Sequence, residues 1–180
     1  IKRFKLPVAQ TTVVVAPRIL LANQLSAEFL EFITDVDVAH VHSGETHHFS
    51  TTNQFELNTW VNNSTKNILI FTTYHSLQKV VNAVDVEVDT IYFDEAHNGC
   101  GRHFHIALSQ IVQYAKRSFF FTATPRMGRG VSLDRGMNNT NIYGGVLENV
   151  PAQELVASGA IVPPKVVPFE TRNTTQRDKY

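Results

Sequence analysis

The sequence predicts an α/β fold in which a mostly parallel sheet is covered by helices on both faces. Two observations support this class. Short β-branched or aromatic runs alternate with stretches whose apolar residues recur at helical spacing. Several strand-like runs, such as residues 11–16, are continuously apolar, which is typical of strands buried on both faces. Because ligands of open α/β sheets lie beyond the carboxyl ends of the strands, residues that follow strands are the first candidates for a site.

Strands are expected where β-branched and aromatic residues cluster between turn residues. The first of them ends before Pro17, because proline cannot donate a hydrogen bond to a sheet. The fourth ends before an acidic pair at Asp94, and Pro163-Pro164 marks the last one. The strands predicted in this way cover residues 11–16, 36–41, 67–72, 88–93, 117–122 and 162–169.

Helices are expected where apolar residues recur every three or four positions. In the first helix, Leu21, Leu25 and Phe29 follow this spacing. The predicted helices cover residues 19–32, 74–81, 103–115 and 150–158, with residues 55–61 as an ambiguous short helix. Gly159 is suited to end the helix at 150–158. The polar or glycine-rich residues 44–54 and 128–141 are expected to form loops, and the polar stretch after Glu170 is expected to be a linker.

Composition limits the possible classes of protein. The chain has 180 residues, of which 43% are hydrophobic and 18% charged, so it is expected to be globular with a sizeable core. The formal net charge is zero, so any contact with nucleic acid must use a local patch or be shared with another domain. Cys100 is the single cysteine, which excludes an intrachain disulfide and favours a reducing, cytoplasmic compartment. No apolar stretch approaches the ~20 residues of a membrane span, and the start at Ile1 indicates a longer parent protein.

An acidic pair, Asp94-Glu95, follows the fourth predicted strand. Burying unpaired charge is costly, so two adjacent acids at the end of a strand favour a bound cation. The Mg²⁺ of a nucleotide complex is a common choice. The next strand is followed by a second polar segment, Thr122-Ala123-Thr124-Pro125. The alternative is that the acids only stabilise the start of a helix.

Four segments together resemble superfamily 2 helicases, in the order and spacing of that family's motifs Ia, Ib, II and III. They are VVVAPR at 13–18, TTYHSL at 72–77, DEAH at 94–97 and TATP at 122–125. Residues 142–144 and 157–163 further resemble the branch that holds the motor subunits of type I and type III restriction enzymes and related phage and repair helicases. The resemblance covers about residues 11–170.

The resemblance implies a RecA-like three-layer sandwich. Residues 1–170 would form the first motor domain, which binds ATP, and residues 171–180 a linker toward a second motor domain. The parent would couple ATP hydrolysis to movement on nucleic acid, most simply double-stranded DNA. Restriction or modification subunits are possible partners.

The resemblance also assigns roles to individual residues. Asp94 would hold Mg²⁺ through water, Glu95 would orient and activate the attacking water, and His97 would contact the γ-phosphate side or the TATP segment. Thr122 and Thr124 would link the nucleotide to the nucleic-acid side. The residues expected to contact the nucleic-acid backbone are Pro17, Arg18, Thr72, Thr73 and, unless it is a solvated loop residue, Arg126.

The family's P-loop, G-x-x-x-x-G-K-[ST], is missing, since the sequence contains no Gly-Lys pair. We therefore expect these 180 residues alone to lack ATPase activity. Two alternatives stay open: an RNA helicase of the DEAH type, and a non-catalytic nucleic-acid-binding module that lost its nucleotide site. A zinc site is a further alternative. Its candidate ligands are His97, Cys100, His103 and His105, or the cluster His40, His42, His47 and His48.

Overall fold

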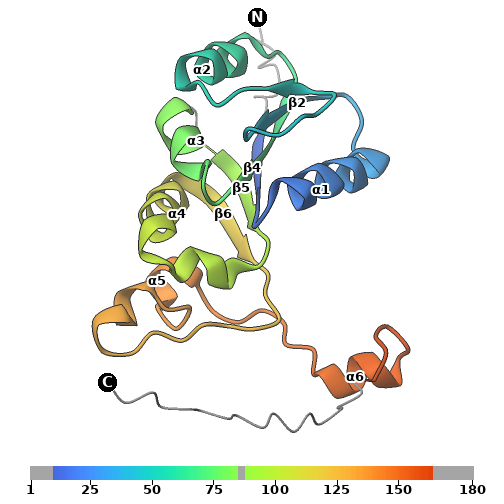
Figure 1. Cartoon of the computed structure of the whole chain (residues 1–180), viewed down its shortest axis with the longest axis vertical. Coiled ribbons are helices and arrows are strands. Elements are labelled where there is room, and N and C mark those ends of the chain that lie inside the picture. Colours follow the sequence, from blue (N-terminus) through green and yellow to red (C-terminus); the bar gives the residue numbers. More distant parts are fainter. Residues whose placement is uncertain (1–9, 85–87, 164–180) are drawn as a thin grey trace, which may run out of the picture. The chain divides into compact units, whose positions relative to one another are not determined.

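The computed structural model describes residues 10–84 and 88–163 (Figure 1). The chain divides into two compact units, Ile1–Gly145 and Val146–Tyr180. The first unit contains the sheet and all of the predicted site residues. Among the described residues of the second unit, one helix forms, α6 (Ala152–Ala157). Gly159, at φ 75°, follows it, as the sequence predicted.

The sheet of the first unit contains six strands within the described residues, in the order β3-β2-β4-β1-β5-β6. Every neighbouring pair is parallel, which confirms the predicted sheet type. The strands are β1 (Thr11–Ala16), β2 (Val36–Val41), β3 (Phe49–Ser50), β4 (Asn67–Thr73), β5 (Val88–Phe93) and β6 (Ala115–Phe120). Their carboxyl ends therefore share one edge of the sheet.

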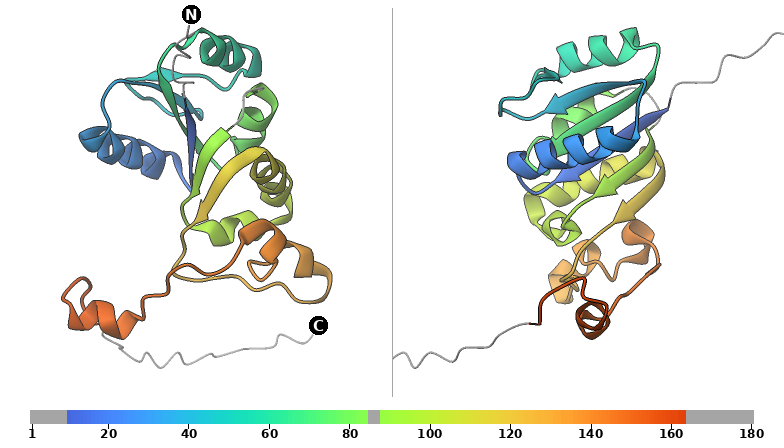
Figure 2. Two further views of the ribbon diagram at one scale, coloured as in Figure 1. Left: turned by 180° about the vertical axis from the view of Figure 1, so that it is seen from behind. Right: turned by 90° about the vertical axis from the view of Figure 1, so that its right-hand side faces the viewer.

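Helices cover both faces of this sheet, so the three-layer prediction is confirmed (Figure 2). α1 (Ile19–Phe32) lies on one face. On the other lie α2 (Gln54–Asn63), α3 (Leu77–Ala83) and α4 (Arg102–Tyr114). The described part of this unit also contains two 3-10 turns, η1 (Ala96–Cys100) and η2 (Gly130–Arg135), and the short α5 (Thr140–Tyr143). None of the helices in the described part of the chain is long and apolar enough to cross a membrane.

The continuous apolar run of β1 is explained by these two faces. Successive side chains of a strand point to opposite sides of its sheet. Val13 and Val15 belong to the core beneath α2, α3 and α4, whereas Val14 and Ala16 belong to a second core that α1 covers. The four side chains from Val13 to Ala16 are thus buried against a helix layer, and a polar residue among these four would lose its water without gaining a partner.

Several predicted boundaries are wrong. The predicted loop at 44–54 contains β3, a two-residue exposed strand that only its pairing with β2 defines. The predicted helix at 74–81 begins at Leu77, because residues 74–76 form a turn in which the Ser76 amide donates to the Thr73 carbonyl. The predicted loop at 128–141 contains η2 and the start of α5. The strand predicted at 162–169 lies largely outside the described residues.

A buried histidine pair lies on β2. His40 is 1% exposed, and its Nδ1 lies 3.0 Å from Nε2 of His42. Its Nε2 lies 3.1 Å from the Ser26 hydroxyl on α1. Burial, with smaller contributions from His42 and His48, lowers the pKa of His40 to about 4. Within the described residues no group of three or more Cys, His, Asp or Glu side chains could hold a metal ion, so the geometry gives neither zinc candidate any support.

We expect acid to destabilise this domain through His40. In the unfolded chain a histidine takes up a proton near pH 6.5, whereas the folded chain resists protonation of His40 until about pH 4. The free energy of unfolding should therefore fall by about 2 kcal/mol between pH 7.5 and pH 5. Urea titrations at the two pH values measure this change. His40→Gln should flatten the pH dependence, and the exposed control His47→Gln should keep it. Equal pH dependence in the wild type and His40→Gln would contradict the assignment.

Candidate functional site

The predicted site residues gather at the carboxyl edge of the sheet. β5 lies between β1 and β6, and all three are parallel. Hydrogen bonds continue this pairing past the strand ends. The Asp94 amide donates to the Val15 carbonyl at 2.9 Å, and the Ala96 amide donates to the Phe121 carbonyl at 2.8 Å. The acidic turn after β5 is therefore fixed between the two neighbouring strands.

The backbone of Asp94 is fixed by hydrogen bonds, whereas its carboxylate is available for a ligand. Its carbonyl accepts a hydrogen bond from the Tyr74 hydroxyl at 2.8 Å. The side chain is half-buried. Among the described residues its carboxylate has neither a hydrogen-bond partner nor an ion-pair partner. A half-buried, unpaired carboxylate on a rigid backbone is suited to hold a cation.

Glu95 has an unusual backbone. Its φ of 46° and ψ of 53° lie in the left-handed region, which a residue other than glycine rarely adopts. Asn98 stabilises this turn by donating from its side-chain amide to the Glu95 carbonyl at 2.8 Å. The conformation turns the chain directly into η1, so that the Glu95 carboxylate lies beside His97. Left-handed residues with side chains concentrate at functional sites.

His97 joins the acidic turn to the segment after β6. Its Nδ1 lies 2.9 Å from the Thr122 hydroxyl, 3.3 Å from the Thr124 hydroxyl and 3.3 Å from a Glu95 carboxylate oxygen. The Thr124 amide in turn donates to the Thr122 hydroxyl at 3.1 Å. This one ring nitrogen therefore has three polar neighbours. The structure thus brings Glu95, His97, Thr122 and Thr124 together.

The threonines that end β4 are enclosed. Thr72 is 0% exposed, and its hydroxyl donates to the Val41 carbonyl at 3.0 Å. Thr73 is buried too. In this conformation neither side chain can present its hydroxyl to a nucleic acid, which is at odds with the predicted contacts. The reason is that helices cover both faces of β4, while β2 supplies the carbonyl that the Thr72 hydroxyl binds, and the local sequence reveals neither.

The basic candidates lie on the surface. Pro17 is half-buried, and Arg18, which is exposed, precedes α1 without a side-chain capping bond. Arg126 is exposed as well, while its carbonyl accepts a hydrogen bond from the Met137 amide at 2.9 Å. Both guanidinium groups are therefore accessible to an anionic ligand.

Tyr74 is a site residue that the sequence reasoning missed. The helical spacing predicts a helix that includes Tyr74, yet its hydroxyl binds the Asp94 carbonyl and its ring is buried. Burial and the neighbouring Asp94 raise the pKa of Tyr74 well above its usual range. A usable signal was present, because a buried tyrosine needs a partner for its hydroxyl, and Tyr74 directly follows a strand end.

The chain is similar to known proteins in sequence and in fold. Residues 1–127, more than half of the chain, match the family "Type III restriction enzyme, res subunit". The fold is similar to that of a nuclease-deletion mutant of the Type ISP restriction-modification enzyme LlaGI, solved in complex with a DNA substrate mimic. The TM-score is 0.67 at 22% identity, over 83% of this chain and 14% of that one. No curated protein sequence matches. The chain therefore belongs to the Type III restriction enzyme res subunit family, and its fold is that of the first motor domain of a superfamily 2 helicase.

Proposed function

We propose that this domain is part of an ATP-dependent motor that moves on DNA, and that its carboxyl edge forms the metal and water side of the ATPase centre. The observation that carries the proposal is the cluster of Glu95, His97, Thr122 and Thr124 beside the unpaired Asp94 carboxylate. The family match and the similarity to an enzyme solved with a DNA substrate mimic support the motor and its substrate.

The residues present fit a magnesium–nucleotide complex. Asp94 supplies a hard oxygen ligand with no competing partner among the described residues, and we assign it the water-mediated hold on Mg²⁺. The metal would neutralise charge on the phosphates of ATP. Glu95 has its carboxylate on the exposed side of the turn, and we assign it the orientation and activation of the attacking water.

His97 and the two threonines would couple the nucleotide to the rest of the motor. Their contacts cross from the turn after β5 to the segment after β6. A bound nucleotide that draws the Glu95 carboxylate away from His97 would free the ring to bind the threonines more firmly. The segment that continues from Thr124 leads directly to Arg126, one of the exposed basic residues. We assign the nucleic-acid contacts to Pro17, Arg18 and Arg126.

The phosphate-binding loop has no counterpart in these residues. The sequence holds no Gly-Lys pair, and within the described residues β6 has β5 as its single neighbour. A strand and P-loop supplied by a longer chain could pair with the other edge of β6. The absence of a Gly-Lys pair from the sequence also favours a second candidate function, a nucleic-acid-binding module that does not hydrolyse ATP. A P-loop encoded upstream of Ile1 would favour the motor.

We expect the Glu95→Gln variant of the full-length protein to lose ATPase activity by about 100-fold or more, because an amide cannot accept a proton from water. Nucleic-acid binding should be unchanged. Steady-state phosphate release and oligonucleotide binding measure the two effects. Glu31→Gln, on the exposed surface of α1, is the matched control and should hydrolyse ATP normally. Unchanged turnover in Glu95→Gln would remove Glu95 from the role of base.

The 180-residue chain should bind Mg-ATP weakly or not at all, since the loop that surrounds the phosphates is missing from it. Calorimetric titration tests this expectation. The same titration on a chain extended upstream through a P-loop should give clear binding. Micromolar affinity in the 180-residue chain would contradict the proposed division of the site.

The left-handed backbone of Glu95 is expected to lower the free energy of unfolding of the domain. A left-handed conformation costs a residue with a side chain roughly 1–2 kcal/mol, whereas glycine adopts it freely. Glu95→Gly should therefore have a higher free energy of unfolding than Glu95→Ala, by about 1 kcal/mol. Urea denaturation of the two variants measures the difference. Asn98 lies outside the left-handed region, so there Asn98→Ala should be more stable than Asn98→Gly. Equal stability of the two Glu95 variants would argue against the conformation.

A further inference from the structure

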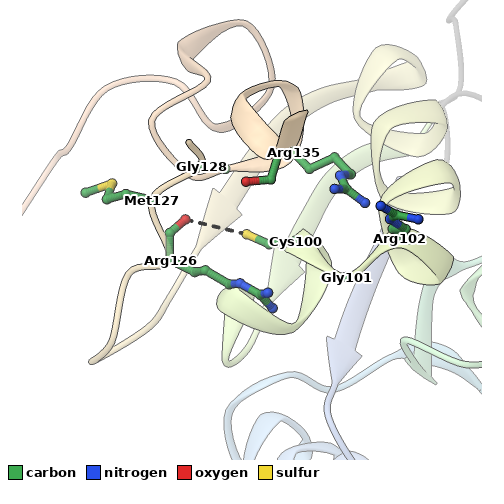
Figure 3. Close-up of a pocket in the computed structure, with 9 residues that line it drawn as sticks. Cys100, Gly101, Arg102, Arg126, Met127, Gly128 and Arg135 are labelled. Atoms are coloured by element: carbon green, nitrogen blue, oxygen red, sulfur yellow. Dashed lines mark hydrogen bonds between the residues drawn. The ribbon is translucent and has the colours of Figure 1, made fainter. Parts of the chain in front are cut away.

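Three arginines from separate elements line one pocket of about 150 Å³ (Figure 3). Arg102 begins α4, Arg126 lies in the loop after β6, and Arg135 ends η2. In Figure 3 the guanidinium groups of Arg102 and Arg135 lie near each other, and the side chain of Arg126 extends beneath the turn at Cys100. The pocket is distinct from the Asp94–Glu95 turn, because neither acid lines it.

The positive charges in this pocket are poorly balanced. The side chain of Arg135 is 16% exposed, and the acid paired with it is Asp134. The Nε of Arg135 lies 3.8 Å from the Asp134 carboxylate, which is beyond hydrogen-bond distance, and the Asp134 side chain is 74% exposed. In the part of the chain that the structure describes, no carboxylate is hydrogen-bonded to any of the three guanidinium groups. Like charges held together without hydrogen-bonded acids favour an anionic ligand.

The wall of the pocket is held in place by its backbone. The Met137 amide donates to the Arg126 carbonyl at 2.9 Å. The Gly128 amide donates to the Asn138 side chain at 2.6 Å. A Cβ atom at Gly136 would collide with the backbone of Gly128, so this close approach requires glycine. The loop that carries Arg126 is therefore closed onto the segment that follows Arg135, and little ordering remains for ligand binding to supply.

We propose that Arg102, Arg126 and Arg135 form a binding site for a phosphodiester group of a nucleic-acid strand. The inference rests on the proposed function, since it takes nucleic acid as the ligand, and it adds a site that the helicase motifs do not include. Planar guanidinium groups bind phosphate oxygens through paired hydrogen bonds. Arg126 follows the TATP segment directly, so a phosphate held here would touch the chain that leads from His97. With zero net charge on the chain, such a local patch is where nucleic acid can be captured.

The test compares the 180-residue chain with its Arg102→Gln, Arg126→Gln and Arg135→Gln variants. Fluorescence anisotropy with a labelled DNA oligonucleotide is recorded over a range of salt concentrations. Each substitution should weaken binding about ten-fold and lower the slope of log affinity against log salt by about one. Arg129→Gln is the matched control, because it removes an exposed arginine of the same loop that does not line the pocket.

Two further measurements separate the possible outcomes. Because Arg135 is mostly buried, the thermal unfolding of Arg135→Gln is compared with that of Arg135→Lys. Arg135→Lys keeps the charge but loses the paired donors, and it should bind DNA with intermediate affinity. A titration with inorganic phosphate follows the amide resonances of Gly128 and Gly136.

Weaker DNA binding in the three pocket variants, with Arg129→Gln unchanged, supports the site. DNA binding that survives in all of them overturns the site, and with it the nucleic-acid contact assigned to Arg126, but leaves the proposed motor and its contacts at Pro17 and Arg18 standing. A wild-type chain that binds inorganic phosphate in the pocket but no DNA overturns the nucleic-acid source and counts against the proposed function as well. A chain that binds neither overturns both.

Discussion

The parallel pairing of β1, β5 and β6 is the constraint on which the site depends. Hydrogen bonds from Asp94 to Val15 and from Ala96 to Phe121 extend this pairing beyond the last residues of the strands. They hold the acidic turn at a fixed distance from the threonines that follow β6. Without them Glu95 could not keep its left-handed backbone, and the three contacts of His97 would be lost. Burial of the strands on both faces makes the arrangement rigid, because any shift would expose apolar surface.

The side chains that support the site are hydrogen-bonded, whereas the charged groups that could bind a ligand have no hydrogen-bonded counterion among the described residues. Tyr74 and Asn98 use their hydrogen-bonding groups to hold the backbone of the acidic turn. The Asp94 carboxylate and the surface arginines, by contrast, have no hydrogen-bonded counterions among the described residues. This separation is typical of sites in which a ligand supplies the missing charge. It also explains how a chain with no net charge can present an acidic turn and a basic pocket within one compact unit.

Sequence reasoning was most accurate where a local pattern decides the structure. The limits of β1, α1, β2 and β5 agree with those predicted, because each is a short run rich in β-branched residues or a helical repeat that ends at a turn residue or a change of pattern. It was least accurate where a distant contact decides. β3 exists only because it pairs with β2, and Tyr74 lies in a turn before the helix, from which its hydroxyl binds the distant Asp94 carbonyl. The roles predicted for Asp94, Glu95 and His97 stay predictions, although the geometry places the last two in contact.

By itself the sequence determined the α/β class, the two-sided burial of the strands and the order of the helicase motifs. Hydrophobic periodicity and motif order depend only on the order of residues along the chain. The strand order was decided only by the tertiary structure, and with it the meeting of His97 with Thr122. The enclosure of Thr72 has the same origin, because the helices that cover β4 and the Val41 carbonyl that binds its hydroxyl come from distant parts of the chain. The pocket of Arg102, Arg126 and Arg135 also needs the fold, because it joins a helix start, a loop and a 3-10 turn that share no pattern in the sequence.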